Sequence, residues 1–78
     1  MGWSGGGDVL EALVTALRQA TIGTDDRRYL LVEAIRALER EDADTLEEVL
    51  DAHENDTWVV RAFRECGYKP YRERINEL

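Results

Sequence analysis

The sequence is short of the residues that cross-link small proteins or bind metals. Its 78 residues include a single cysteine, Cys66, and a single histidine, His53. One cysteine cannot close an intrachain disulfide, and one histidine with one cysteine cannot complete a structural zinc site. We therefore expect no metal and no cofactor. At this length the apolar core is small, so the stability of the fold is expected to be marginal.

Long apolar runs are missing as well. No stretch approaches about 18 consecutive apolar residues, so no membrane span is predicted. The N-terminus has no charged segment followed by an apolar one, so no export signal is predicted either. The unpaired Cys66 fits a reducing compartment, with a disulfide-linked dimer as the alternative. We expect a soluble, cytoplasmic protein that makes no contact with a membrane.

Negative charge dominates what is present. The chain has 17 acidic and 10 basic residues, for a net charge of −7. Residues 37–57 hold nine carboxylates and one arginine, whereas residues 58–78 hold five basic and three acidic side chains. The negative electrostatic field of such a chain repels nucleic acid and attracts basic surfaces. The sequence therefore predicts a protein partner with a basic surface and disfavours direct nucleic-acid binding.

Apolar residues recur at helical spacing throughout, and no alternating run is long enough for a strand. Asp8 and Glu11 form a capping box, which predicts a first helix after a flexible, Gly-rich leader at residues 1–7. Gly23 is expected to end this helix. The second helix is expected to begin at Thr24 or the next residue, with acidic side chains in its first turn.

Three shorter helices are expected to follow. Asp44 is the predicted cap of a helix at residues 45–53, and Asp56 is the predicted cap of another that ends at Gly67. Pro70 is expected in the first turn of the last helix. The sequence thus predicts an all-α fold, a small bundle or orthogonal array of four to five short helices, with residues 8–78 forming one domain. The expected inward-facing residues are Leu10, Leu13, Val14, Leu17, Leu31, Ala34, Ile35, Leu38, Leu46, Val49, Leu50, Val59, Val60, Phe63 and Cys66.

Two local patterns resemble a catalytic or a metal-binding motif, but neither has the surrounding structure that such a motif requires. Residues 2–6 fit the G-x-S-x-G pattern around Ser4, but a nucleophile elbow requires a preceding strand, and none is predicted. His53 and Asp56 are three residues apart, yet the predicted helix break between them separates their side chains. We therefore predict no catalytic and no metal-binding residue, and a protein that is not an enzyme.

Binding is the function that these patterns favour. The carboxylates of residues 39–56 can form a negative ridge on consecutive helices, and an exposed tryptophan can anchor a partner. The alternative is that these carboxylates form an acidic surface that contacts only solvent and binds no partner. The candidate partner-binding residues are Glu39, Glu41, Asp42, Glu47, Glu48, Asp51, Trp3 and Trp58.

Three other binding hypotheses stay open. The acidic ridge can imitate duplex phosphates, which would make the protein a DNA-mimic inhibitor of a nucleic-acid-handling protein. A small core also suits a self-associating structural protein, such as a homodimer. The basic C-terminal segment can bind nucleic acid through its cations and aromatic rings. Its residues are Arg61, Arg64, Lys69, Arg72 and Arg74, interleaved with Phe63, Tyr68 and Tyr71.

Three short motifs run along most of the chain: the leader at residues 2–6, the acidic turn at residues 42–45, and Ala62-Phe63-Arg64 before Gly67. In these motifs the sequence resembles a group of small uncharacterised acidic proteins encoded by actinobacteria and their phages or plasmids. Ala43 departs from the aromatic residue that often precedes the Asp-Thr pair in that group. The resemblance implies a phage or accessory-gene product that modulates or inhibits a host protein, and it carries over no site residue.

Overall fold

The chain folds into five helices and, over the residues described, no strand. A computed structural model describes residues 5–43 and 45–76. The all-α fold predicted from the sequence is confirmed. None of these five helices is long and apolar enough to cross a bilayer. The helices are α1 (Gly6–Gln19), α2 (Thr24–Arg40), α3 (Leu46–Ala52), α4 (Thr57–Glu65) and α5 (Tyr71–Asn76).

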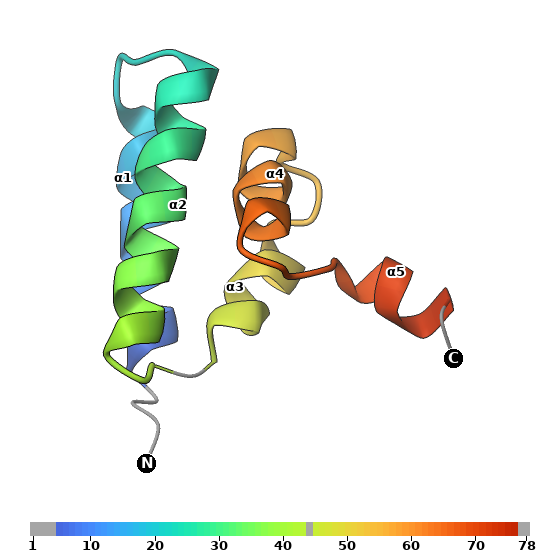
Figure 1. Ribbon diagram of the computed structural model, residues 1–78. Helices are drawn as coiled ribbons and strands as arrows, with labels where there is room; N and C mark the ends of the chain where they lie inside the picture. Colours follow the sequence, from blue (N-terminus) through green and yellow to red (C-terminus); the bar gives the residue numbers. More distant parts are fainter. Residues whose placement is uncertain (1–4, 44, 77–78) are drawn as a thin grey trace.

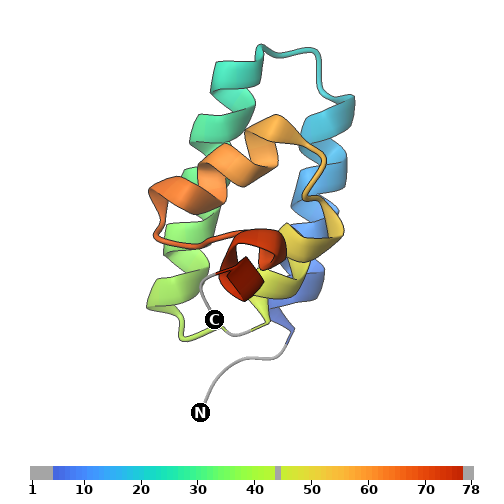
Figure 2. The same ribbon diagram turned by 90° about the vertical axis from the view of Figure 1, so that its right-hand side faces the viewer.

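The helices form two layers. α1 and α2 run antiparallel as a hairpin, and α3, α4 and α5 lie on one side of it (Figure 1). Viewed from that side, α4 crosses in front of the hairpin and α5 lies outermost (Figure 2). The main helix contacts join α2 to α4 and α1 to both α3 and α2. The other side of the hairpin is not covered by any part of the chain that the structure describes.

The core lies between the two layers and is built from apolar side chains of α1 to α4. No polar or charged residue is buried among the residues that the structure describes. Most of the predicted core is confirmed, although Leu13, Ala34, Leu38, Val60 and Cys66 are only partly buried. Buried residues that the sequence analysis did not assign inward are Val32, Trp58 and Ala62. The buried core cluster is Leu10, Val14, Leu17, Leu31, Val32, Ile35, Leu46, Val49, Leu50, Trp58, Val59, Ala62 and Phe63.

The first helix begins earlier than predicted. α1 starts at Gly6, so Asp8 lies within its first turn and is not its cap, and two glycines assigned to the leader are helical. The reason is a contact distant in sequence: the Gly7 N–H donates to Thr45 Oγ1 at 3.2 Å. A Cβ at Gly7 would lie 2.7 Å from that oxygen, so glycine allows the backbone to approach this closely.

Gly23 plays a different part from the one predicted. α1 ends at Gln19, and Gly23 is the residue before α2, with an extended backbone at φ −70°. The α1 C-terminus is satisfied by Arg27, whose Nη2 donates to the carbonyls of Arg18 and Ala20 at 3.2 and 2.9 Å. α2 begins at Thr24, as predicted.

The predicted cap Asp44 lies outside the described residues. α3 begins at Leu46, one residue later than expected, and Thr45 precedes it in the left-handed conformation at φ 63°. Thr45 does not cap α3 with its side chain. Its hydroxyl accepts the N–H of Gly7 and so ties the start of α3 to the start of α1.

α4 ends as predicted. Gly67 has φ 92°, in the region that favours glycine. The N–H of Tyr68 donates to Phe63 O, and that of Gly67 donates to Arg64 O, both at 3.0 Å, which is the paired bonding of a Schellman motif. The Tyr68 and Phe63 rings meet edge to face at 5.3 Å. Pro70 is buried directly before α5, and its carbonyl accepts two N–H groups of α5.

Candidate partner-binding surface

The acids of α3 are divided between two surfaces. Glu47 and Asp51 are four residues apart, so they lie on one face of the helix. Arg74 of α5 fits between them: its Nη2 donates to both carboxylate oxygens of Asp51, at 2.8 and 2.9 Å, and its Nη1 pairs with Glu47. Two predicted partner-binding residues are therefore already engaged within the chain.

Glu39 is engaged as well. The Tyr68 hydroxyl donates to Glu39 Oε2 at 3.1 Å, which joins the end of α2 to the segment after α4. Burial and the neighbouring carboxylate of Glu39 raise the pKa of Tyr68 to about 12. Desolvation likewise raises the pKa of the Cys66 thiol, whose Sγ lies 3.9 Å from Val32 O. Cys66 is therefore a small packing residue with little thiolate character.

A second group of acids surrounds a hollow of about 200 Å³ between the starts of α1 and α3. Its carboxylates are Asp8, Glu11 and Glu48, and Val49 supplies an apolar wall. Asp8 and Glu48 are exposed and form no ion pair with a cation of the described residues. Of the acids predicted from the sequence to bind a partner, Glu48 is the one that faces this hollow.

Beside the hollow, His53 lies in a polar cluster that joins α1 to the turn after α3. Its Nε2 is 2.7 Å from Glu11 Oε1, and its Nδ1 is 3.2 Å from Asp56 Oδ2. Arg18 Nη2 lies 2.9 Å from the same Nδ1 and also pairs with Asp56. The His53 side chain is 11% exposed. The predicted helix break between His53 and Asp56 is present, since α3 ends at Ala52 and α4 begins at Thr57. It does not separate the two side chains as expected, because the turn, in which the N–H of Asp56 donates to His53 O at 2.9 Å, brings them together.

The arrangement of this cluster fits a structural link. Both ring nitrogens lie within hydrogen-bond distance of groups of the chain itself, Nε2 of Glu11 and Nδ1 of Arg18 and Asp56. The ring therefore joins α1 to the turn between α3 and α4. No group of three or more histidine, cysteine or acidic residues in the described chain is arranged to hold a metal ion.

Of the two predicted tryptophan anchors, the structure describes Trp58. Trp58 is 8% exposed and belongs to the core, so its prediction as an exposed anchor is corrected. It lies next to Val59 at the start of α4, where the inward face is wide enough to take both side chains. Trp3 and Ser4 lie outside the described residues. The exposed aromatic residues are instead Tyr29 on α2 and Tyr71 on α5.

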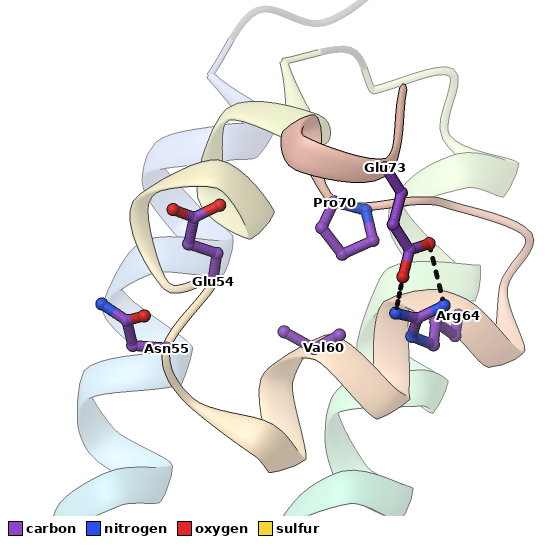
Figure 3. A pocket seen from close by; sticks show the side chains of 6 residues that line it. All are labelled: Glu54, Asn55, Val60, Arg64, Pro70 and Glu73. Atoms are coloured by element: carbon purple, nitrogen blue, oxygen red, sulfur yellow. Dashed lines mark hydrogen bonds and ion pairs between the residues drawn. The ribbon is translucent and has the colours of Figure 1, made fainter. Parts of the chain in front are cut away.

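A further hollow, of about 180 Å³, lies between the α3–α4 turn and α5 (Figure 3). An ion pair between Arg64 and Glu73 closes one side of it, with Nη1 of Arg64 3.0 Å from Oε2 of Glu73. Arg64 holds the pKa of the Glu73 carboxyl below its usual value. Pro70 and Val60 supply apolar walls, and Glu54 and Asn55 line the side away from this ion pair (Figure 3). Two cations of the basic C-terminal segment, Arg64 and Arg74, are thus paired with acids of the chain.

The chain matches no described protein family, no curated protein and no solved structure. Its resemblance to small actinobacterial and phage-encoded proteins therefore stays a prediction.

Proposed function

We propose that this protein is a small, non-enzymatic binding module for a protein with a basic surface. The observation that carries the proposal is the acid-lined hollow of Asp8, Glu11 and Glu48, two of which have no cation partner in the described chain. An arginine or lysine of a partner would lay its alkyl stem against Val49 and place its charge among the carboxylates.

The neighbouring face of α3 supports this recognition chemistry. There the chain's own Arg74 lies between Glu47 and Asp51, as a partner's arginine would lie among the acids of the hollow. Glu48 follows Glu47 directly in the sequence, and the rotation of about 100° per residue places it on the adjacent face of α3. The proposed contact is therefore narrower than the ridge of residues 39–56. Glu41 and Asp42 are exposed residues of the α2–α3 connection and do not line the hollow.

The two nucleic-acid hypotheses are weaker. A DNA mimic needs a row of unpaired carboxylates, whereas Glu39, Glu47, Asp51 and Asp56 are all engaged by groups of the chain. Binding of nucleic acid by the C-terminal segment needs free cations on a chain that does not repel phosphate. Its arginines are partly paired, and the net charge is −7. The phage or accessory-gene setting implied by the resemblance would make the bound partner a host protein that is modulated or inhibited.

The test is affinity capture from a lysate of the source cell, with mass spectrometry of the retained proteins at low and high salt. The informative variant is Asp8→Asn with Glu48→Gln, which removes the two carboxylates of the hollow that have no cation partner in the described chain. A matched control is Asp26→Asn with Glu33→Gln, which removes one first-turn aspartate and one exposed glutamate of α2. We expect a partner that is released at high salt, and about tenfold weaker binding for the hollow variant only. Equal retention of the partner by the hollow variant and the wild type would refute the proposal.

A further inference from the structure

α5 is held against the rest of the chain by charged side chains, and its own apolar side chains point away from it. Arg74 pairs with Glu47 and Asp51 of α3. Tyr71 and Ile75 are 55% and 45% exposed, and their spacing of four residues places them on one face of α5. A helix that turns its apolar face to solvent gains little stability from packing, so α5 is expected to detach more readily than α1 to α4.

Arg74 occupies α3 in the manner of a bound ligand. Its guanidinium group bridges two acids through separate nitrogens: Nη2 donates to both carboxylate oxygens of Asp51, at 2.8 and 2.9 Å, and Nη1 pairs with Glu47. The Arg74 side chain is only 26% exposed, so the chain encloses most of it. The planar fork of a guanidinium suits this bridging better than the point charge of a lysine does. α3 thus carries a formed arginine site, and Arg74 fills it.

This arginine site adjoins the acidic hollow between the starts of α1 and α3. Glu47 belongs to the arginine site, and Glu48, the next residue, lines the hollow. The rotation of about 100° per residue makes the two faces neighbours on α3. A helix is about 10 Å wide with its side chains, a length that about three extended residues of a partner span. A basic segment bound at the hollow can therefore bring a second arginine to Glu47 and Asp51.

Charge decides what can take the place of Arg74. Without this arginine, Glu47 and Asp51 would be two neighbouring carboxylates on a chain with a net charge of −7. Such a pair attracts another cation and repels an acidic group. The hollow attracts the same kind of side chain, so one arginine-rich segment has the chemistry to bind at both faces of α3.

We propose that α5 is an autoinhibitory strap: Arg74 fills a second arginine site of the binding surface from within the chain, and an arginine of the partner displaces it. The inference rests on the proposed function, because the hollow brings the partner to α3. Molecules with α5 in place bind through the hollow alone, whereas molecules with α5 detached bind through both faces. The apparent affinity falls with the fraction of molecules that are competent to bind, so α5 weakens the binding of every partner that uses both faces.

A fluorescein-labelled hexa-arginine peptide is the probe, and fluorescence anisotropy measures its binding to the full chain at about 50 mM salt. Arg74→Gln frees the two acids, and we expect about tenfold tighter binding, the gain that follows if about one tenth of the wild-type molecules have α5 detached. Arg61→Gln makes the same change in net charge at an exposed position of α4 and should bind at most about twofold tighter than the wild type. Far-UV circular dichroism checks that both variants fold. Equal affinities of the two variants would overturn the proposal.

A second variant separates the release of α5 from the exposure of the acids. Glu47→Gln with Asp51→Asn also removes the ion pairs of Arg74, but it leaves no acids for the peptide to bind. Its affinity should therefore not exceed that of Asp26→Asn with Glu33→Gln, which removes two exposed acids of α2. Binding about tenfold tighter than this control would show that a detached α5 uncovers some other surface, and the proposal would be wrong.

Hydrogen exchange of the wild type with saturating peptide tests the displacement itself. α5 should lose protection in the complex, while the core amides of α4 keep theirs. An α5 that is equally protected with and without the peptide would refute the displacement.

The hollow variant, Asp8→Asn with Glu48→Gln, keeps the two proposals apart. It should weaken binding of the peptide both in the wild type and in Arg74→Gln, and the tenfold ratio between these two backgrounds should remain. If the hollow variant bound the peptide as tightly as the wild type, the proposed function would fail. The ratio between the Arg74→Gln and Arg61→Gln affinities would still decide whether Arg74 blocks an arginine site.

Discussion

The first four helices and the last one are held in different ways. α1 to α4 share a core of apolar side chains in which Phe63 and Leu50 are fully buried. α5 is attached by Pro70, which is buried, and by two sets of ion pairs. Arg74 pairs with acids of α3, and Glu73 pairs with Arg64 of α4. The apolar side chains of α5, Tyr71 and Ile75, are exposed.

Because α1 to α4 are held by apolar burial and α5 largely by ion pairs, the two parts should respond differently to salt and to protonation. Apolar burial contributes about 25 cal/mol per Å², is not screened by salt and does not require a charged side chain. Exposed ion pairs contribute about 0–1 kcal/mol each and are screened by salt. We therefore expect the α1–α4 body to unfold as one unit, whereas α5 opens separately at a lower free energy.

The largest loss of stability is expected from a substitution in the core of the α1–α4 body. Trp58→Ala removes a side chain that is 8% exposed, which should lower the free energy of unfolding by about 3–5 kcal/mol. A domain of this size has only about 4–12 kcal/mol in total, so much of the variant is expected to be unfolded at 37 °C. Urea titration followed by far-UV circular dichroism measures the change. Trp58→Phe, which keeps an aromatic ring, is the control and should cost less than Trp58→Ala. An unchanged midpoint for Trp58→Ala would show that Trp58 is not part of the core.

The body is also the part that the sequence predicts best. Helix number and most buried positions follow from apolar spacing, which is a local property of the chain. The Gly67 terminus was equally predictable, because a left-handed glycine after an amphipathic run is a local signal. Trp58 was missed as a core residue because its neighbour Val59 already occupies an inward position, and a wide inward face is not evident from spacing alone.

The contacts that sequence reasoning missed are distant along the chain. The start of α1 depends on Thr45, which is 38 residues from Gly7. The polar cluster joins Glu11 to His53 across 42 residues. One signal was present in the sequence: Glu11 and Arg18 are seven residues apart, on one face of an otherwise uncharged stretch. Their partners could not be identified, because nothing local fixes how α3 packs against α1.

A smaller effect is expected at the junction between the body and α5. Gly67 has φ 92°, and no atom lies within 4 Å of a Cβ built there. Gly67→Ala therefore tests backbone strain alone and should destabilise the body by about 1–2 kcal/mol. The matched control is Gly23→Ala, where the space is equally open but φ is −70°. Its effect should stay within about 0.5 kcal/mol. Thermal unfolding of both variants measures the difference, and equal melting temperatures would show that Gly67 is not held in the left-handed conformation.

The smallest effect is expected at α5 itself, on lowering the pH. Arg64 holds the pKa of Glu73 below its ordinary value of 4.5. A carboxyl with a lowered pKa in the folded state stabilises that state above its ordinary pKa, and this contribution is lost as the pH falls through the lowered value. α5 should therefore lose hydrogen-exchange protection as the pH falls below 4.5 and through the lowered pKa of Glu73, while the core amides of α4 keep theirs.

Protection factors corrected for the intrinsic exchange rate measure this change in each helix. Arg64→Gln removes the partner of Glu73, so α5 of this variant should already be weakly protected at neutral pH and should respond less to acid. As a control, Arg61→Gln removes another exposed arginine of α4, and it should leave the acid response of α5 intact. If α5 and α4 lost protection together in the wild type, α5 would belong to the same cooperative unit as the body. The ion pairs would then add to an attachment that Pro70 already secures.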